Sequence, residues 1–284
     1  MASRAVCVVG MHRSGTSAVA RGVSALSVDL GDNFFDLQPD NPTGYWEDKT
    51  IVGINQRVLE ELKLKWDDAA PIARDRFMHH RIRLLRLKAV RYFNEHFTAR
   101  PLWGFKDPRT IRLLPFWVDA LHDCSAEDAY VVAIRHPLSV AASLFRRQEI
   151  TREKAERLWL AHNVPFLHEL RGKPLAVVDY DLLMQEPRAQ LERIARKLGL
   201  RPEDGNSPAI EHFAAEFLDE RLRHTAFAPD DFDATTGAGR LTHRAYVMLY
   251  ALASDRREPD ARFWAEWEEL QRRLAAAKVL DGAA

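Results

Sequence analysis

The sequence predicts an α/β fold in which a parallel β-sheet is flanked by helices and followed by a helical C-terminal extension. Three short apolar runs have the length and composition of buried parallel strands, namely Ala5–Val9, Tyr130–Ile134 and Leu175–Val178. A weaker run, Leu102–Phe105, is expected to be a fourth strand. Long segments with helical spacing of apolar residues separate these runs. Strands that alternate with helices are typical of a wound parallel sheet, because each crossover helix covers one face.

The helical segments follow each strand in turn. Five of them are predicted within the sheet region: Ala18–Leu26, Thr110–Leu121, Pro137–Arg147, Thr151–Leu170 and Pro187–Leu198. Two further helices, Leu241–Ala253 and Asp260–Lys278, are predicted to close the chain. Turn residues without periodicity predict long loops at Gly31–Gly44 and Pro229–Gly239. We therefore expect one domain over residues 1–284, with its motifs in residues 4–200 and a helical part in 201–284.

Composition excludes several classes of protein. The 284 residues are 46% hydrophobic and 29% charged, so the chain can bury a large core and is neither disordered nor collagenous. Its 41 Lys and Arg balance 41 Asp and Glu, which argues against a nucleic-acid partner that needs a broad positive field. Two cysteines, Cys7 and Cys124, provide neither a disulfide framework nor a zinc site. No apolar stretch has a signal peptide's core or the roughly 18 residues of a membrane span, so a cytoplasmic protein is expected.

A basic run occupies Arg76–Arg91 and contains no acidic residue. Its leucines share the segment with Phe77, Ile82 and Val90. The simplest interpretation is an amphipathic helix with a solvated basic face. The alternative is a surface that attracts an anionic acceptor or carrier.

A glycine loop follows the first predicted strand, with the sequence Gly10-Met11-His12-Arg13-Ser14-Gly15-Thr16-Ser17. A loop between a strand and a helix can direct backbone N–H groups at an anion, and the helix N-terminus adds partial positive charge. Gly10 and Gly15 have the spacing of a P-loop, but Thr16 occupies the position of the lysine that contacts the phosphates of ATP. Arg13 within the loop can clamp a phosphate through its fork of N–H groups. The predicted sheet is therefore of P-loop type and suited to an anion other than ATP.

A second polar segment follows the predicted strand Tyr130–Ile134. Arg135 emerges at the strand's carboxyl end, Pro137 suits the start of a helix, and Ser143 lies two turns into that helix. Ligands of open α/β sheets bind at the carboxyl ends of strands. Arg135 and Ser143 are therefore expected to share a phosphate.

The two segments together resemble those of a known family. The loop HRSGTS and the later segment AIRHPLSVAAS resemble the motifs of sulfotransferases that use 3′-phosphoadenosine 5′-phosphosulfate (PAPS). The segment Gly104-Phe105-Lys106-Asp107-Pro108-Arg109 resembles the KDP element of the bacterial and protein-tyrosine branches. Val178–Leu183 and Leu198–Leu200 resemble the family's later strand and helix. The resemblance covers residues 4–200.

This resemblance implies a transfer of the sulfuryl group from PAPS to a hydroxyl or amine acceptor, without a metal. It implies that the 5′-phosphosulfate is held by loop residues, namely His12, Arg13, Ser14, Gly15, Thr16 and Ser17. Arg135 and Ser143 would hold the 3′-phosphate that distinguishes this donor from ATP. Lys106 and Arg13 would place positive charge beside the departing oxygen, where negative charge develops.

The general base is less defined, because Pro108 occupies the position at which the small-molecule branch has a histidine. The protein-tyrosine branch uses a glutamate on an early segment instead. Glu47, in the segment GYWED, is therefore the first candidate, followed by its neighbour Asp48 and then by Asp107 and His12. Glu47 and Asp48 also suit the start of a helix, and Asp107 could orient Lys106 through a salt bridge.

Two other functions remain open. A P-loop kinase is favoured by Asp179 at the end of an apolar run, but Thr16 argues against it. A non-catalytic module that binds a nucleotide or a glycan would differ from the enzyme only at the acceptor site. The acceptor is a small molecule or a glycan, possible classes being carbohydrate hydroxyls, lipids, phenols and peptide tyrosines. Four aromatic residues could stack on it or could pack the loop: Phe34, Phe35, Tyr45 and Trp46.

Overall fold

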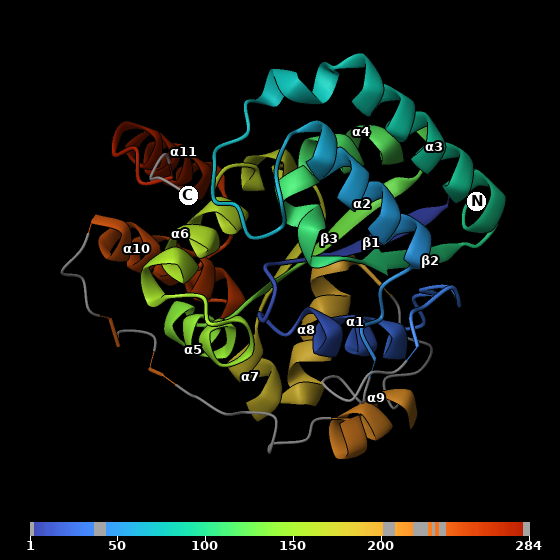
Figure 1. Cartoon of the computed structure of the whole chain (residues 1–284). Helices are drawn as coiled ribbons and strands as arrows, with labels where there is room; N and C mark the ends of the chain where they lie inside the picture. The colour runs from blue at the N-terminus through green and yellow to red at the C-terminus, as the bar shows by residue number, and fades with distance from the viewer. Residues whose placement is uncertain are drawn as a thin grey trace.

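A computed structural model describes residues 3–36, 44–200, 208–217, 227–228, 231–232 and 237–280. Four parallel strands form one sheet in the order β2-β1-β3-β4 (Figure 1). The strands are β1 (Arg4–Val9), β2 (Leu102–Lys106), β3 (Glu127–Ile134) and β4 (Leu175–Asp179). All four predicted strands are confirmed, and helices flank the sheet as expected.

The helices cover both faces of the sheet (Figure 1). The α-helices are α1 (Thr16–Ala25), α2 (Lys49–Glu61), α3 (His80–His96), α4 (Leu114–Asp123), α5 (Pro137–Gln148), α6 (Arg152–Asn163), α7 (Tyr180–Gln185), α8 (Pro187–Leu198), α9 (Pro208–His212), α10 (Gly237–Ala253) and α11 (Ala261–Ala276). Shorter 3₁₀ turns are η1 (Arg74–Met78), η2 (Pro108–Leu113) and η3 (Leu167–Leu170), and the π-helical turn η4 covers Phe213–Phe217.

The two faces of the sheet bury separate hydrophobic clusters. Alternate residues of β1 point to opposite faces, as the pleat requires. Cys7 and Val9 join the larger cluster, which contains residues of α2, α3, α4, α6, α10 and α11. Val6 and Val8 join the smaller cluster with residues of α1, α8 and α9. Because both faces are covered, every residue from Ala5 to Val9 is buried, which explains the continuous apolar run in the sequence.

Prolines account for two differences from the predicted helices. The predicted helix Thr151–Leu170 is wrong in its second half: α6 ends at Asn163, and only the short turn η3 follows. Pro165 lacks the N–H that would continue the helical hydrogen bonds, and a proline ring in a helix clashes with the carbonyl four residues earlier. The predicted helix Thr110–Leu121 is divided into η2 and α4. Pro115 lies in the first turn of α4, the position where its missing N–H is tolerated.

The remaining differences concern ends and loops. The helix α2 has no counterpart in the predicted elements, and α10 begins at Gly237, inside the predicted loop Pro229–Gly239. Residues 37–43 of the predicted loop Gly31–Gly44 lie outside the described residues, as do residues 229–230 and 233–236. The basic run folds as η1 followed by α3, so the predicted helix is confirmed from His80 onward. Its buried side carries Ile82 and Ala89, whereas Leu84 and Leu87 are exposed. Within the described part of the chain, no helix is long and apolar enough to cross a membrane.

Candidate functional site

The predicted site residues lie together at the carboxyl edge of the sheet. The glycine loop (residues 10–17) follows β1, Lys106 ends β2, and Arg135 follows β3. Because β1 lies between β2 and β3, these three segments are neighbours at one edge. The register aligns Val8 with Lys106, which sets the lysine beside the start of the glycine loop.

Close packing explains both glycines of the loop. Gly10 has a φ of +153°, and a Cβ there would lie 2.3 Å from the carbonyl oxygen of Ala133 in the neighbouring strand. Gly15 has a φ of +80°, and a Cβ there would lie 2.1 Å from the Tyr180 ring. Only glycine fits these positions without displacing a neighbour. The loop therefore has a fixed path into α1, which begins at Thr16.

Arg13 joins the glycine loop to α5. Its Nε donates to Oγ of Ser143 at 2.9 Å, and its backbone has a left-handed φ of 69°. Burial lowers the pKa of the Arg13 guanidinium, and so do the positive charges of Arg147 and Arg135. The hydroxyl of Ser14 is buried in the same loop and has no hydrogen-bond partner among the described residues. This concentration of positive charge and unused donors suits an anion.

Arg135 is only 7% exposed, and its guanidinium lies 4.5 Å from the centre of the Tyr180 ring. Burial, as the largest effect, lowers its pKa, while Tyr180 and Asp181 act in the opposite direction. Ser143 was expected to pair with Arg135 on a shared phosphate. In this structure the Ser143 hydroxyl accepts from Arg13, which links the two predicted anion-binding segments directly, and the pairing with Arg135 stays a prediction.

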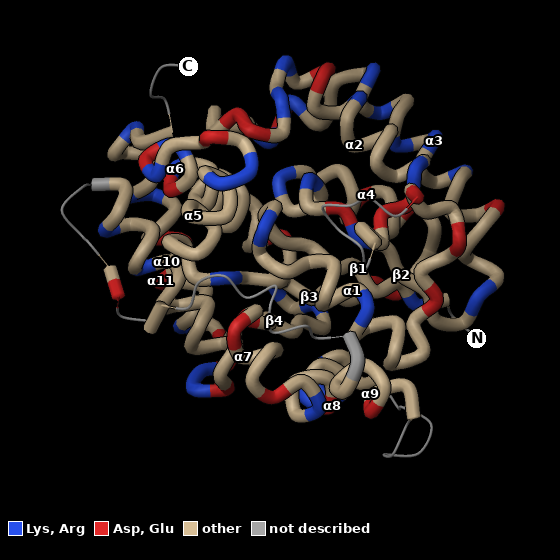
Figure 2. Tube along the Cα trace, turned by 60° about the horizontal axis from the view of Figure 1, so that its bottom comes forward, with Lys and Arg blue, Asp and Glu red and all other residues tan. Residues whose placement is uncertain are grey.

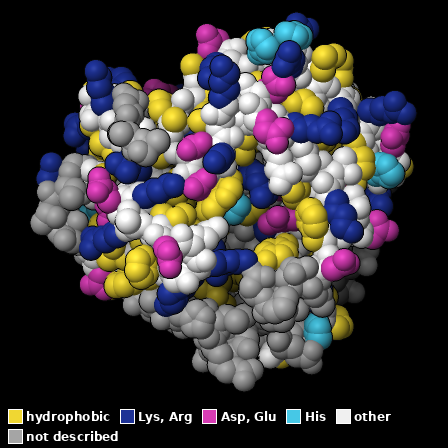
Figure 3. Space-filling model, in the orientation of Figure 1, with side chains coloured by type: hydrophobic (Ala, Val, Ile, Leu, Met, Phe, Trp, Pro, Cys, Tyr) yellow, Lys and Arg dark blue, Asp and Glu magenta, His cyan; other side chains and the backbone are white. Residues whose placement is uncertain are grey.

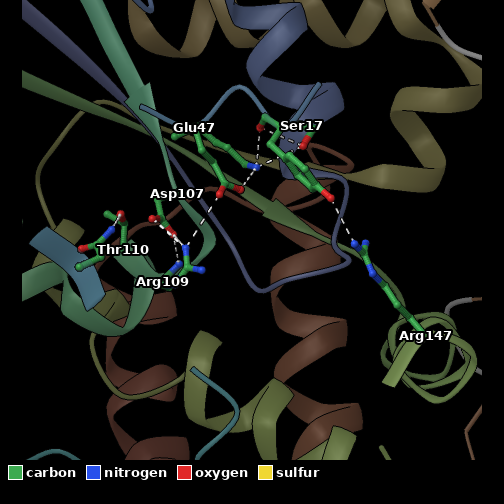
Figure 4. A network of polar contacts seen from close by, with 9 residues as sticks. Ser17, Glu47, Asp107, Arg109, Thr110 and Arg147 are labelled. Carbon is green, nitrogen blue, oxygen red and sulfur yellow. Dashed lines mark hydrogen bonds and ion pairs between the residues drawn. The ribbon is translucent and has the colours of Figure 1, made fainter. Parts of the chain in front are cut away.

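Lys106 is the centre of a buried polar network. Figure 4 shows this part of the site, with Ser17 and Glu47 labelled. With 2% of its side chain exposed, its Nζ donates to Ser17 Oγ at 3.1 Å, to the Tyr45 carbonyl at 2.9 Å and to Glu47 Oε1 at 2.6 Å. The second carboxylate oxygen of Glu47 lies 3.9 Å from Nη1 of Arg109. The structure therefore brings three predicted site residues, Ser17, Glu47 and Lys106, into direct contact.

The other two candidate acids have local structural partners. Asp107 is fully buried, caps η2 through the N–H of Arg109, and accepts from the Arg109 guanidinium at 2.9 and 3.0 Å. It therefore orients Arg109, and not Lys106 as the sequence suggested. Asp48 caps α2 with one oxygen and accepts from the Tyr92 hydroxyl at 2.6 Å with the other. Their carboxylates are committed to holding the site's framework.

His12 lies in the same cavity and packs against Trp66, with 4.6 Å between ring centres. Burial lowers its pKa well below the usual range, and the positive charges of Arg109, Lys106 and Arg13 act in the same direction. The imidazole is therefore neutral at pH 7. Its Nε2 has no hydrogen-bond partner among the described residues.

A cavity of about 500 Å³ opens beside the Lys106 network, and Figure 3 shows the hollow near the middle of that face. Residues from three regions line it: loop residues His12, Arg13, Thr16 and Ser17; network residues Tyr45, Glu47, Lys106 and Arg109; and outer residues Phe35, Gln56, Trp66, Arg147 and Gln148. Of the four aromatic candidates, Phe35 and Tyr45 line the cavity. Phe34 and Trp46 pack against each other at 5.5 Å and are part of the loop's packing.

Trp66 lines the cavity but was not among the predicted site residues. This residue lies in a segment without periodicity, and its position depends on contacts distant in sequence. The Arg112 guanidinium donates to the backbone carbonyls of Asp68 and Ala70, which ties the segment to η2. Lys154 adds an ion pair to Asp67 at 2.8 Å. A lone tryptophan beside two acids was the only available signal.

Asp179, the residue that favoured a kinase, has structural partners. Its carboxylate caps α7 by accepting from the N–H groups of Asp181 and Leu182, and it accepts from the Tyr246 hydroxyl at 3.1 Å. Across the residues that the structure describes, no group of three or more His, Cys, Asp or Glu side chains is arranged to hold a metal ion.

Comparison with known proteins agrees with the sequence motifs. The sequence profile of the sulfotransferase family matches residues 5–204, whereas no curated protein gave a match. Among solved structures, the sulfotransferase domain of the curacin biosynthetic pathway is 16% identical with a TM-score of 0.49, covering 87% of this chain and 98% of its own. The sulfotransferase domain of the Synechococcus olefin synthase is 16% identical with a TM-score of 0.45, covering 96% of this chain and 95% of its own. A sulfotransferase from Mycobacterium tuberculosis is 14% identical with a TM-score of 0.40, covering 74% of this chain and 71% of its own. The profile match spans more than half of the sequence, and the chain belongs to the sulfotransferase family.

Proposed function

We propose that this protein transfers a sulfuryl group from PAPS to a hydroxyl or amine of its acceptor. Family membership supports the reaction class. The choice of donor rests on the 2.9 Å hydrogen bond between Arg13 and Ser143, which places the glycine loop beside the segment after β3. Two anion-binding segments side by side suit a nucleotide that carries phosphate at both its 5′ and its 3′ position.

The positive charges of the two segments suit the negative charges of such a nucleotide. Arg135 is buried, and its positive charge is one of those that lower the pKa of the nearby Arg13. A bound anion would relieve this repulsion. We assign the 5′ end to residues 12–17 of the glycine loop, and the 3′-phosphate to Arg135 and Ser143.

When bound, PAPS supplies the sulfuryl group and departs as the bisphosphate nucleotide. Lys106 and Arg13 hold positive charge at the carboxyl edge, where the departing oxygen gains negative charge. Because Lys106 is 2% exposed, its field is screened little by water, and fixed charges of this kind stabilise a transition state without reorganisation. Alignment of the reactants contributes the remainder.

Glu47 is the proposed general base. Lys106 donates to its Oε1 at 2.6 Å, and both residues line the cavity. An anion placed beside Lys106 competes for its ammonium group, which frees this carboxylate oxygen to accept the proton of an acceptor hydroxyl. Asp107 and Asp48 are engaged by Arg109, Tyr92 and backbone N–H groups, which is why we place the base at Glu47.

We propose a carbohydrate hydroxyl as the acceptor group. The outer part of the cavity presents the Trp66 ring together with the amides of Gln56 and Gln148. Neither amide has a hydrogen-bond partner within the described part of the chain. An aromatic face with neutral amides suits a ring that carries hydroxyl groups, since the ring packs on the tryptophan and the amides both donate and accept.

The experiment is transfer of radiolabelled sulfur from PAPS to a panel of oligosaccharides, phenols, lipids and tyrosine peptides. We expect labelled oligosaccharide together with stoichiometric release of the bisphosphate nucleotide. Labelling of another class only would contradict the carbohydrate proposal but not the reaction. Nucleotide binding without transfer to any class would favour the non-catalytic module, and magnesium-dependent phosphate transfer from ATP would favour the kinase.

A further inference from the structure

The outward face of α3 combines exposed leucines with basic side chains. Leu84 and Leu87 are 62% and 61% exposed, the two most exposed large hydrophobic residues in the described structure. At the helical repeat they form a stripe with His80 and Arg91, because these four residues are spaced by three or four positions. We call this surface, with the flanking residues Arg83 and Lys88, the α3 face.

The cations of the α3 face differ in their partners. Arg91 pairs with Glu95 on the next turn, and Arg86, on the inner side, pairs with Asp119 and Asp123. Arg83 and Lys88 are exposed and have no ion-pair partner among the described residues. They flank the leucines on opposite sides of the helix. Figure 2 shows that Lys and Arg positions recur along α3.

A hollow adjoins the N-terminal end of this face. It has a volume of about 710 Å³ and is lined by residues of η1, of the start of α3 and of the end of α2, among them Met78, Arg81 and the acids Glu61 and Asp75. Met78 is itself 53% exposed. In Figure 3, hydrophobic, basic and histidine side chains gather at the upper edge of the molecule, over η1 and α3.

The geometry points to a docking surface for an acidic, amphipathic helix of another protein. An apolar centre with a charged rim is the usual arrangement of a protein interface. The chain has no net charge, so unpaired cations on one face select an acidic partner locally. Partner leucines spaced at one helical turn would pack on Leu84 and Leu87, while glutamates on both sides would face Arg83 and Lys88.

Two other occupants fit this face less well. Helices that lie in a membrane surface insert a broad apolar face, but the broad apolar face of α3, with Ile82, Ala89 and Phe93, is buried in this protein's own core. Only two leucines remain for insertion. A second copy of this chain, docked symmetrically through the same face, would bring the unpaired cations Arg83 and Lys88 of both copies into one interface, where like charges repel.

The test uses a fluorescent synthetic helix with leucines spaced by three and four residues and glutamates along both flanks. We expect saturable micromolar binding to the full-length protein that weakens as salt is raised. The double variant Arg83→Ala/Lys88→Ala, which removes two exposed cations, should bind the peptide about three- to tenfold more weakly at low salt. Removing the apolar centre in Leu84→Gln/Leu87→Gln should weaken it by at least about tenfold.

Two controls make the result specific. Arg262→Ala/Arg272→Ala removes two exposed cations from α11 and should leave binding unchanged. A peptide with glutamine in place of glutamate should bind more weakly than the acidic peptide. No saturable binding, or equal binding by the α3 variants, would overturn the proposal. Tighter binding to vesicles of equal parts phosphatidylcholine and phosphatidylserine, lost in the same variants, would replace the protein partner with a membrane.

Discussion

Replacing Lys106 with methionine tests the core of the proposed site, because methionine keeps the length of the side chain and removes its charge. In the wild type the ammonium makes three hydrogen bonds, including the 2.6 Å contact with Glu47. In the variant, the Glu47 carboxylate, which is 13% exposed, keeps only one charged partner. This partner is Arg109, whose Nη1 lies 3.9 Å from Glu47 Oε2 and is already bonded to Asp107. Breaking a buried ion pair typically lowers stability by about 3–5 kcal/mol, and the remaining arginine places our expectation near 3 kcal/mol.

The effect on catalysis should be separate from this loss of stability. Removing one preorganised charge from a reacting oxygen lowers kcat by about 10²- to 10³-fold. We expect Lys106→Met to show this loss in release of the bisphosphate nucleotide, while calorimetry shows a smaller change in nucleotide affinity. In Lys106→Met/Glu47→Gln the unpaired carboxylate is removed, so urea denaturation should show at least about 1 kcal/mol of recovered stability. That recovery should not restore kcat.

If the Lys106→Met protein keeps kcat within about threefold of wild type while its nucleotide binding weakens, the proposed role of Lys106 in the transition state is wrong. Lys106 would then bind the donor in its ground state and contribute nothing specific to the transition state. A double variant less stable than Lys106→Met would refute the part of the argument that concerns Glu47.

Three further predictions concern the donor, the base and pH. Arg135→Ala should weaken binding of the 3′-phosphorylated nucleotide far more than binding of adenosine 5′-phosphosulfate, measured by calorimetry, because only the former carries the 3′-phosphate. Glu47→Gln should bind nucleotide normally and lose about 10²- to 10⁴-fold in turnover, whereas His12→Gln should not. Burial and Asp181 raise the pKa of Asp179 to about 6, above its unfolded value near 3.9. The stability that this shift contributes is therefore present below about pH 3.9 and is lost as the pH rises through about 6, by about 3 kcal/mol in total. Urea denaturation of Asp179→Asn, which can still cap α7, should lack this pH dependence.

Each of these predictions has a defined opposite. If Arg135→Ala weakens the binding of both nucleotides equally, Arg135 does not bind the 3′-phosphate. If Glu47→Gln stays within a few-fold of wild type while Asp107→Asn loses turnover, the base lies beside Lys106 at the end of β2. A stability difference between wild type and Asp179→Asn that stays constant from pH 4 to 7 would show that another group carries the titration.

The positions of the strands and of the glycine loop after β1 could be predicted because their signals are local. Ala5–Val9 is buried on both faces, which makes it continuously apolar, and the six-residue stretch that begins at Gly10 and ends at Gly15 marks the turn into α1. Ends of helices were predictable only where a proline or a glycine marks them. Pro165 is an exception: a proline follows the end of α6, but the apolar spacing that continues beyond it led to a predicted helix that is too long.

The partners within the site could not be predicted in the same way. Whether Asp107 faces Lys106 or Arg109 depends on side-chain rotation at the end of β2, and the spacing permits either. Trp66 reaches the cavity because Arg112 holds its segment through backbone carbonyls, a contact between residues about 40 positions apart that leaves no sequence pattern. The ion pair of Glu47 with Lys106 joins segments 59 residues apart.

The most direct test of the proposed donor compares three nucleotides by calorimetry on the wild-type protein. We predict that 3′-phosphoadenosine 5′-phosphate binds at least about tenfold more tightly than adenosine 5′-phosphate, since one charge-assisted contact to a phosphate contributes about 1.5–3 kcal/mol. We also predict that it binds more tightly than ATP, with or without magnesium. Equal affinity for 3′-phosphoadenosine 5′-phosphate and adenosine 5′-phosphate would contradict the assignment of Arg13, Arg135 and Ser143 to a doubly phosphorylated donor. Tighter, magnesium-dependent binding of ATP would contradict it as well.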